Sequence, residues 1–411
     1  TTLLLSANAV LIRDFATDSK PDGATIRNKL APQAADLLVD PGPFNQTTSN
    51  TNISIIGGTI QTVKSANKGP HIVLAFADHS EIRDVRFRGV FGNWNVTLLG
   101  SYLDVSGLDI DSGTTIFEDG VHIWGGDHIT ISDCRIKCGD DAIIIGANHN
   151  FAASDISISN IVVDSTQGNA IKLAHTRAGD TASFATPTEK IQRINISNIS
   201  GTAGVTRNGL IATDFTGNTS DDLLRDVNIS NVALKHGLIA NNTVNPWGVY
   251  ISGGLRISLD SIVVDSPIRS AFRIQDAADI AITNCSAFGI QETASGRFCI
   301  DANDVTQIIV TGGSFTNTTT HVSRFRNCTD VIINGCKMKS NPANTAGILL
   351  DGTTTRVIIS GVICTSASSA GQGIRVNADT VSEVQIIGCS LKQNATPLLE
   401  SFTGKITQAI I

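Results

Sequence analysis

The chain has 411 residues and a formal net charge of −7, and 16% of its residues are charged, against about 25% in an average globular protein. Its 41% of apolar residues is ample material for a core and excludes a disordered chain. No apolar run reaches the roughly 18 residues of a membrane span, and no basic tract marks a nucleic-acid-binding face. We therefore expect neither a membrane span nor a nucleic-acid partner.

Residues 1–50 differ from the rest of the chain, and we expect them to form an N-terminal cap together with the first strands. They hold Pro21, Pro32, Pro41 and Pro43, which interrupt regular elements. A cap would protect the open edge of the first coil from aggregation. The opening TTLLLSANAVLI lacks the basic region and the A-x-A site of a secretory signal peptide, so we expect no signal peptide there.

Residues 51–411 repeat one short phrase, in which an apolar strand of period two is followed by an Asn, Asp or Gly turn and a second apolar strand. About thirteen copies occur, among them NISIIGGTIQ from Asn52, DISISNIVV from Asp155 and VIINGCKM from Val331. Two short strands cannot bury their apolar face alone, whereas stacked units share one core. The sequence therefore predicts an all-β fold, a parallel β-helix with one coil per copy.

A β-propeller is the alternative repeat architecture, but each of its blades needs about 40–50 residues, which is longer than the repeat in this chain. Two insertions interrupt the coils, at Thr176–Glu189 and at Leu238–Pro246. Insertions on one face of a solenoid often frame a binding groove, and we expect that role here.

Four cysteines occupy the same position in their copies of the repeat: Cys134, Cys285, Cys336 and Cys389. This regularity predicts inward-facing side chains that serve as small buried apolar residues. The sequence contains no C-x-x-C pair and no Cys/His cluster with zinc spacing. We therefore expect neither a metal site nor a cofactor.

Four carboxylates gather in two neighbouring coils. We align FEDGVHIW from Phe117, GDDAIIIG from Gly139, QGNAIKLA from Gln167 and TRNGLIAT from Thr206. The alignment predicts one column of stacked residues, made of Asp119, Asp141, Asn169 and Asn208. The residues before the two aspartates are Glu118 and Asp140. A second column, three residues further on, holds His122, Ile144, Lys172 and Ile211.

Carboxylates on coils about 5 Å apart repel one another, so one of them is expected to have a raised pKa. Such a pair divides into an acid and a base, which is the pair that glycoside hydrolysis requires. An Asp before Gly is also an ordinary turn residue. Two stacked acidic pairs on a charge-poor chain nevertheless favour catalysis.

FEDGVHIW followed by ITISDCRIKCGDDAIIIG resembles the N-T-D and G-D-D segments of glycoside hydrolase family 28, the polygalacturonases. The resemblance covers residues 1–215 and, more loosely, the rest. It implies a pectin-lyase-like, right-handed β-helix and an inverting hydrolysis of a polysaccharide. On this resemblance Asp119, Asp140 and Asp141 are catalytic, with Asp141 the acid and the other two holding water. Diagonal positions on adjacent coils are expected to supply the roughly 6.5–9.5 Å that inversion needs between acid and base.

The chain also departs from that family. The N-T-D asparagine is Phe117, the G-H-G histidine falls at Asn169, and the R-I-K cations fall at Ile211 and Thr213. The clamp for galacturonate is therefore missing, and we do not expect pectin as the substrate. The candidate residues for a different sugar subsite are Glu118, His122, Asn169, Lys172, His175, Arg177 and Asn208.

β-Helices without the pectin-binding residues also resemble bacteriophage tailspikes, which are trimers that bind and depolymerise bacterial surface polysaccharide. This resemblance implies a homotrimer, a polysaccharide partner, and a secreted or virion-surface location. Two alternatives from other classes remain open. One is a non-catalytic carbohydrate-binding solenoid, and the other is a polysaccharide lyase whose acids hold Ca²⁺ and whose base is Lys172 or Arg135.

Overall fold

The computed structural model describes residues 2–6, 8–13, 26–28, 49–62, 70–89, 94–113, 118–147, 151–174, 189–204, 209–214, 223–236, 247–290, 297–317, 320–340, 345–366, 371–378, 380–391, 396–400 and 406–410. Every regular element in these ranges is a β-strand, as predicted. Within the same ranges no helix is long and apolar enough to cross a membrane. The chain divides into two compact units, and each is a stack of parallel strands.

The first unit comprises Thr1–Arg207, Ile211–Asn218 and Gly237–Asn241. Its strands are β1 (Thr2–Leu4), β2 (Val10–Arg13), β3 (Ile26–Arg27), β4 (Asn50–Thr51), β5 (Ser54–Ile56), β6 (Thr59–Thr62), β7 (Ile72–Arg83), β8 (Arg86–Arg88), β9 (Val96–Ser106), β10 (Asp109–Asp111), β11 (Val121–Cys138), β12 (Ile143–Gly146), β13 (Ala153–Ser165), β14 (Ile171–Ala174), β15 (Ile191–Ala203) and most of β16 (Gly209–Asp214).

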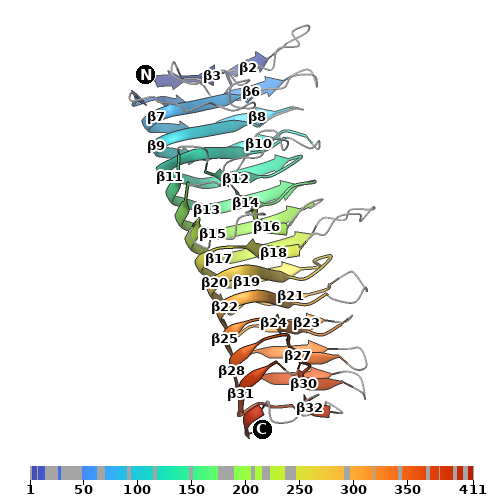
Figure 1. The fold of residues 1–411 in the computed structure, drawn as a ribbon. Coiled ribbons are helices and arrows are strands. Elements are labelled where there is room, and N and C mark those ends of the chain that lie inside the picture. The colour runs from blue at the N-terminus through green and yellow to red at the C-terminus, as the bar shows by residue number, and fades with distance from the viewer. Residues whose placement is uncertain are drawn as a thin grey trace, which may run out of the picture. The chain divides into compact units, whose positions relative to one another are not determined.

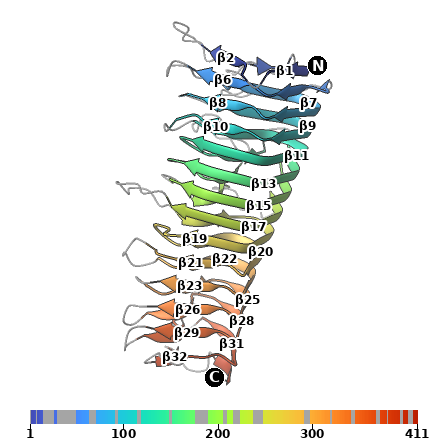
Figure 2. The same cartoon turned by 180° about the vertical axis from the view of Figure 1, so that it is seen from behind.

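Three parallel ladders form the faces of this unit. One runs β1–β5–β7–β9–β11–β13–β15, a second β2–β6–β8–β10–β11, and a third β3–β7–β9–β11–β12–β14–β16. Strands β7 and β9 take part in two ladders and β11 takes part in all three, because these strands bend around corners (Figure 1). Figure 2 shows β7, β9, β11, β13 and β15 lying one below another from behind. This arrangement is the predicted right-handed parallel β-helix.

The second unit comprises Asn208–Leu210, Thr219–His236 and Asn242–Ile411. Its strands are β17 (Leu224–His236), β18 (Trp247–Ser252), β19 (Leu255–Asp265), β20 (Phe272–Thr283), β21 (Ser286–Phe288), β22 (Ile300–Thr311), β23 (Ser314–Asn317), β24 (Ser323–Arg326), β25 (Thr329–Asn334), β26 (Lys337–Ser340), β27 (Ala346–Asp351), β28 (Thr355–Ser360), β29 (Ile363–Ser366), β30 (Gln372–Val376), β31 (Ser382–Ile387), β32 (Thr396–Glu400) and β33 (Ile406–Ile410). Its longest ladder is β17–β19–β20–β22–β25–β28–β31–β33.

Each copy of the sequence phrase contributes a strand to one of the two longest ladders, from β5 to β31. Strands β1 and β33 extend those ladders beyond the first and last copies, so the number of coils differs slightly from the predicted thirteen. Most of the predicted cap and nearly all of both insertions lie outside the described residues. Among the described residues of the cap, β1, β2 and β3 pair with β5, β6 and β7.

Left-handed backbone residues turn the chain at the corners. Asp133, Asn160 and Asn198 stand at one corner of successive coils with φ of 56–58°. The Asn160 Nδ2 donates to Asp133 Oδ1 at 3.0 Å, and the Asn198 Nδ2 donates to Asn160 Oδ1 at 3.0 Å. Asn and Asp tolerate this conformation better than other side-chain-bearing residues. The Asn, Asp or Gly of each repeat therefore serves a backbone turn and, on these coils, links one coil to the next.

The inward positions hold the coils together. In β13 Ile156, Ile158 and Ile161 are at most 1% exposed, and they pair directly with Ile194, Ile196 and Ile199 of β15. Burial of each Ile side chain contributes roughly 1.5–3 kcal/mol to the free energy of unfolding. A slip of one residue would turn this row outward, so the apolar column sets the register.

The four cysteines in the repeat column are buried, as predicted, and all eight cysteines are free thiols. Each of the four donates its Sγ–H to the carbonyl two residues earlier, as Cys134 does to Ser132. Burial raises the pKa of Cys134, Cys285 and Cys336 to about 12. These thiols therefore carry almost no thiolate at neutral pH.

We predict that the native protein resists thiol reagents until it unfolds. Ellman's reagent at about pH 8 should label none of the thiols rapidly in buffer, and all eight in guanidinium chloride. The reason is that the reagent requires an accessible thiolate. Rapid labelling of the folded protein would contradict the buried positions.

Candidate active site

The pairing of three short strands stacks the central residues of the site. Val121 in β11 pairs with Ile143 in β12, which pairs with Ile171 in β14. The residues two positions before them, Asp119, Asp141 and Asn169, therefore lie on successive coils, in the predicted order. Backbone hydrogen bonds continue the ladder there, because Gly120 N donates to Asp141 O at 3.0 Å and Ala142 N donates to Asn169 O at 2.9 Å.

The predicted alignment of the next coil is wrong by one residue. Ile211 pairs with Ile171, and Ala212 pairs with Lys172, so the second column runs through Ala212 and not through Ile211. Ile171 and Ile211 are both 0% exposed, and matching these inward side chains sets the register. Three candidate residues, His175, Arg177 and Asn208, lie outside the described residues.

Asp119 is held as a hydrogen-bond acceptor in a buried position. It is 3% exposed, its Oδ1 accepts the backbone N–H of Asp141 at 3.2 Å, and its Oδ2 lies 3.2 Å from His122 Nδ1. Burial lowers the pKa of His122 to about 3, so the ring is neutral at physiological pH. A neutral ring donates from one nitrogen only, and the Nδ1–H tautomer is the one that serves Asp119. Both contacts favour the ionised form of this carboxylate.

Asp141 has a different environment. It is 6% exposed, and its Oδ1 accepts two hydrogen bonds from Asn169, from the backbone N at 2.7 Å and from Nδ2 at 2.6 Å. Its Oδ2 lies 4.0 Å from Lys172 Nζ. Burial outweighs these contacts and, with the nearby Asp140 carboxylate, raises the pKa of Asp141 above its ordinary value. Asp141 therefore retains a proton to a higher pH than an exposed aspartate does.

Asp140 completes the cluster and is only half-buried. One carboxylate oxygen from each of Asp119, Asp140 and Asp141 lies within 4.8 Å of the others. This spacing is shorter than the predicted acid–base separation. Such a group of oxygens also has the ligand chemistry of a Ca²⁺ site, although Ca²⁺ takes 6–8 oxygen ligands and the Lys172 ammonium lies beside Asp141.

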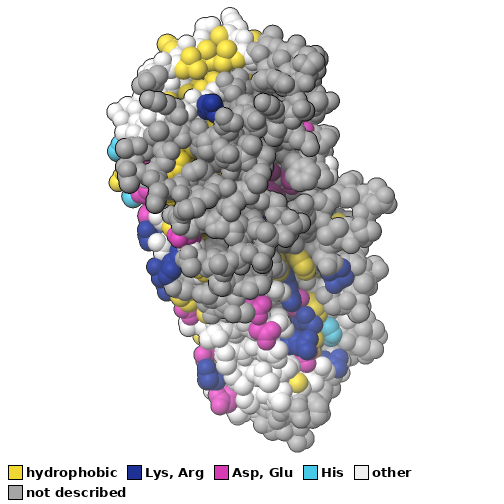
Figure 3. Space-filling model, turned by 45° about the horizontal axis from the view of Figure 1, so that its top comes forward, with side chains coloured by type: hydrophobic (Ala, Val, Ile, Leu, Met, Phe, Trp, Pro, Cys, Tyr) yellow, Lys and Arg dark blue, Asp and Glu magenta, His cyan; other side chains and the backbone are white. Residues whose placement is uncertain are grey.

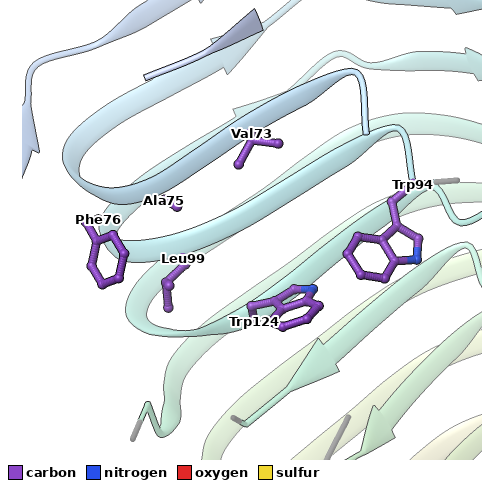
Figure 4. Close-up of a cluster of buried hydrophobic side chains, with 6 residues drawn as sticks. All are labelled: Val73, Ala75, Phe76, Trp94, Leu99 and Trp124. Carbon is purple, nitrogen blue, oxygen red and sulfur yellow. The ribbon is translucent and has the colours of Figure 1, made fainter. Parts of the chain in front are cut away.

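Two tryptophans that were not among the predicted site residues, Trp94 and Trp124, pack against the site. The Trp94 ring lies 4.2 Å from the His122 ring and 5.3 Å from the Trp124 ring, measured between centroids. Figure 4 shows Trp94 and Trp124 as neighbours in a buried apolar cluster that extends through Leu99 to Phe76. The chain has three Trp residues in all, and Trp124 ends the FEDGVHIW segment itself, which was an available signal.

The remaining predicted binding residues differ in how accessible they are. Glu118 is 0% exposed, so a polymer on the surface would not contact it directly. Asn169 directs its amide to Asp141, and His122 directs its ring to Asp119. The Lys172 side chain is 16% exposed. Lys172 and Asp140 are therefore the members of the site that a substrate reaches first.

The low pKa of His122 predicts a pH-dependent stability. In the unfolded chain His122 has a pKa of about 6.5 and takes up a proton below that pH, whereas in the native protein it does so only near pH 3. The free energy of unfolding therefore falls as the pH is lowered from about 6.5 to about 3. Between about pH 7 and about pH 4.5 the fall due to His122 should be roughly 2 kcal/mol. Urea unfolding at both pH values should show a smaller fall in His122→Asn than in the wild type. The exposed His128, changed to Asn, is the control that keeps the wild-type fall; equal falls in all three proteins would refute the assignment.

No protein-family model matches the chain, and no curated protein matches it in sequence. Solved structures match its fold at low identity. The A-module of the Azotobacter vinelandii mannuronan C-5 epimerase AlgE6 is 12% identical, with a TM-score of 0.45 over 88% of this chain and 91% of that one. A mutant tailspike protein of E. coli bacteriophage HK620, in complex with a pentasaccharide, is 12% identical, with a TM-score of 0.46 over 83% and 60%. The catalytic unit of a GH87 α-1,3-glucanase from Streptomyces thermodiastaticus is 10% identical, with a TM-score of 0.44 over 88% and 61%.

Proposed function

We propose that the acidic cluster is the active site of a glycoside hydrolase that cuts a polysaccharide. The observation that carries the proposal is the contrast between two carboxylates on adjacent coils. Asp119 accepts the backbone N–H of Asp141 and lies beside the neutral His122 ring, whereas burial and the neighbouring Asp140 carboxylate raise the pKa of Asp141. A pair of carboxyl groups whose environments separate their pKa values divides into a base and an acid.

In the proposed hydrolysis one carboxyl group donates a proton and another accepts one. Protonated Asp141 gives its proton to the glycosidic oxygen as the bond from that oxygen to the anomeric carbon breaks. Ionised Asp119, with Asp140, takes a proton from the water whose oxygen attacks the anomeric carbon. Asn169 positions Asp141, and His122 positions Asp119. The products are two shorter chains, one of which has a new reducing end.

The stereochemical outcome that we propose is inversion, because the family resemblance implies it. The compact cluster, with oxygens within 4.8 Å of one another, is closer to the roughly 5–5.5 Å carboxyl separation of retaining enzymes. NMR of the anomer that forms first decides between them. An inverted anomer supports the water-holding role of Asp119 and Asp140, and a retained one makes Asp119 a nucleophile.

For the substrate we propose an extracellular polysaccharide other than pectin. The family's cationic clamp is missing, and the one described cation of the site, Lys172, faces Asp141. On the face drawn in Figure 3, Lys and Arg side chains are interspersed with Asp and Glu among the described residues. A secreted or virion-surface location and a tailspike-like homotrimer belong to the same proposal, and light scattering that finds a monomer would count against the trimer.

Replacing Asp141 by Asn should reduce the release of reducing sugar by about 10²–10⁴-fold, because the amide cannot protonate the leaving oxygen. Binding of the polymer should persist. Asp133→Asn is the matched control, because Asp133 is exposed at a left-handed corner where Asn fits equally well. Unchanged activity in Asp141→Asn would disprove the role of this residue.

The pH–rate profile should report Asp141 directly. The rate should fall as the pH rises through the Asp141 pKa, because the acid must carry its proton. The Lys172 ammonium lowers that pKa, so Lys172→Met should move the alkaline limb to higher pH, while Lys172→Arg should leave it close to the wild type. An alkaline limb that stays in place in Lys172→Met would show that another group limits the rate.

Two other classes of function give different products. A lyase would form unsaturated chain ends that absorb ultraviolet light, and chelation of Ca²⁺ from its acidic cluster would abolish activity. A non-catalytic solenoid would retain the polymer and release nothing. Analysis of the products of bacterial capsule and plant-wall polysaccharides separates the three.

A further inference from the structure

A surface depression of about 620 Å³ lies at a corner of the first unit, and the proposed reaction does not use it. Its apolar side is lined by the buried Phe76 and Leu99 and by the half-buried Phe151, and its polar side includes Asp127 and Asp155. This volume is within the range of pockets that bind small molecules, about 300–1,000 Å³.

Two irregularities in the strands build the apolar side. In β7 Ala75 pairs with Leu99 and Ala77 pairs with Gly100, so Phe76 is an extra residue, and its φ of 52° is rare for an aromatic residue. Its ring packs edge-to-face on Phe151, with centroids 5.7 Å apart.

The second irregularity falls in β11, between Ile123 and Gly126. A side chain at Gly125 would place its Cβ 2.6 Å from the Phe151 Cβ, so glycine makes room for that ring. Strained residues and bulges persist where the surrounding structure supports them, and they cluster at functional sites.

The polar side is rich in acceptors. Asp78 Oδ1 accepts the Ser101 backbone N–H at 3.2 Å, and Asp127 accepts the Ser101 hydroxyl and lies 2.6 Å from His128 Nδ1. Asp155 forms two hydrogen bonds with Arg193, each of 2.7 Å. These carboxylates are partly exposed, and each has room for further donors because a carboxylate offers about four acceptor positions.

The charge of the depression selects among ligands. Three carboxylates face one guanidinium, and that guanidinium is already bound by Asp155. The excess negative charge disfavours anionic ligands such as uronates. Hydroxyl groups donate to carboxylates, and an apolar wall accepts the C–H face of a sugar ring.

We propose that this depression binds neutral sugar residues of a polysaccharide. The buried cluster of Figure 4 joins it to the acidic site, because Leu99 and Phe76 line the depression and Trp94 packs on His122. Phe76, which lines the depression, and Trp94, which packs on His122 of the acidic site, lie at opposite ends of this cluster (Figure 4). Binding here does not require that Asp141 cut the chain.

The test is affinity electrophoresis of Asp141→Asn protein, which leaves the gel polymer intact, through gels that contain dextran, a galactomannan or polygalacturonate. Dextran or galactomannan should retard the protein, and polygalacturonate should not. Asp127→Asn should weaken the retention about tenfold, because a neutral amide oxygen accepts a weaker hydrogen bond from a sugar hydroxyl than a carboxylate does. Asp155→Asn should also weaken it.

Asp226→Asn is the matched control for Asp155→Asn. Asp226 is bound by Arg256 in the second unit with the same two-bond geometry, at 2.6 and 3.0 Å, and it lies outside the depression. Its replacement should leave retention unchanged. Equal losses in the two variants, no retention by either neutral polymer, or stronger retention by polygalacturonate would overturn the proposal. Release of reducing sugar by Asp141→Asn would instead overturn the proposed hydrolysis and leave this comparison intact.

Discussion

The structure depends on one constraint, which is that each inward apolar residue must lie directly over its counterpart on the neighbouring coil. Ile171 over Ile211 and Ile156 over Ile194 are instances, and all four are at most 1% exposed. Because side chains alternate along a strand, a slip of one residue would expose the whole row. The same register places every outward residue, so the positions of Asp119 and Asp141 follow from the packing of the core.

Stacking similar residues concentrates like charge, and the first unit resolves this in two ways. At the exposed corner it alternates the charges, as Asp155 and Arg193 show. At the acidic site it leaves carboxylates together and gives each a different neighbour, His122 for Asp119 and Asn169 for Asp141. The first solution adds little stability, because exposed ion pairs contribute about 0–1 kcal/mol. The clustered carboxylates at the acidic site lower the stability of the fold, because Asp141 is buried. Buried titratable groups of this kind are common in active sites.

The sequence predicted the features of this protein that the apolar pattern within each repeat determines, and it did not predict contacts that depend on residues outside that pattern. The repeated phrase predicted the strands and the stacking of Asp119, Asp141 and Asn169, because the register follows from the local apolar pattern. It failed by one residue at Ile211, where TRNGLIAT has an Asn at the same distance from an apolar residue as in QGNAIKLA, and that match concealed the shift. The partners of Trp94 were not predictable, because Trp94 precedes β9 and lies outside the strands whose pairing the repeat determines.

Departures from the repeat are therefore the informative positions in such a fold. A regular coil presents rows of similar residues at a fixed spacing. Phe76 and Gly125 each add one residue to a strand, which breaks the row and brings the rings of Phe76 and Phe151 together without disturbing the inward column. The pairing resumes at Ala77 with Gly100 and at Gly126 with the same Gly100, so the core remains in register on both sides. A solenoid can in this way acquire a binding site while it keeps the packing on which its stability depends.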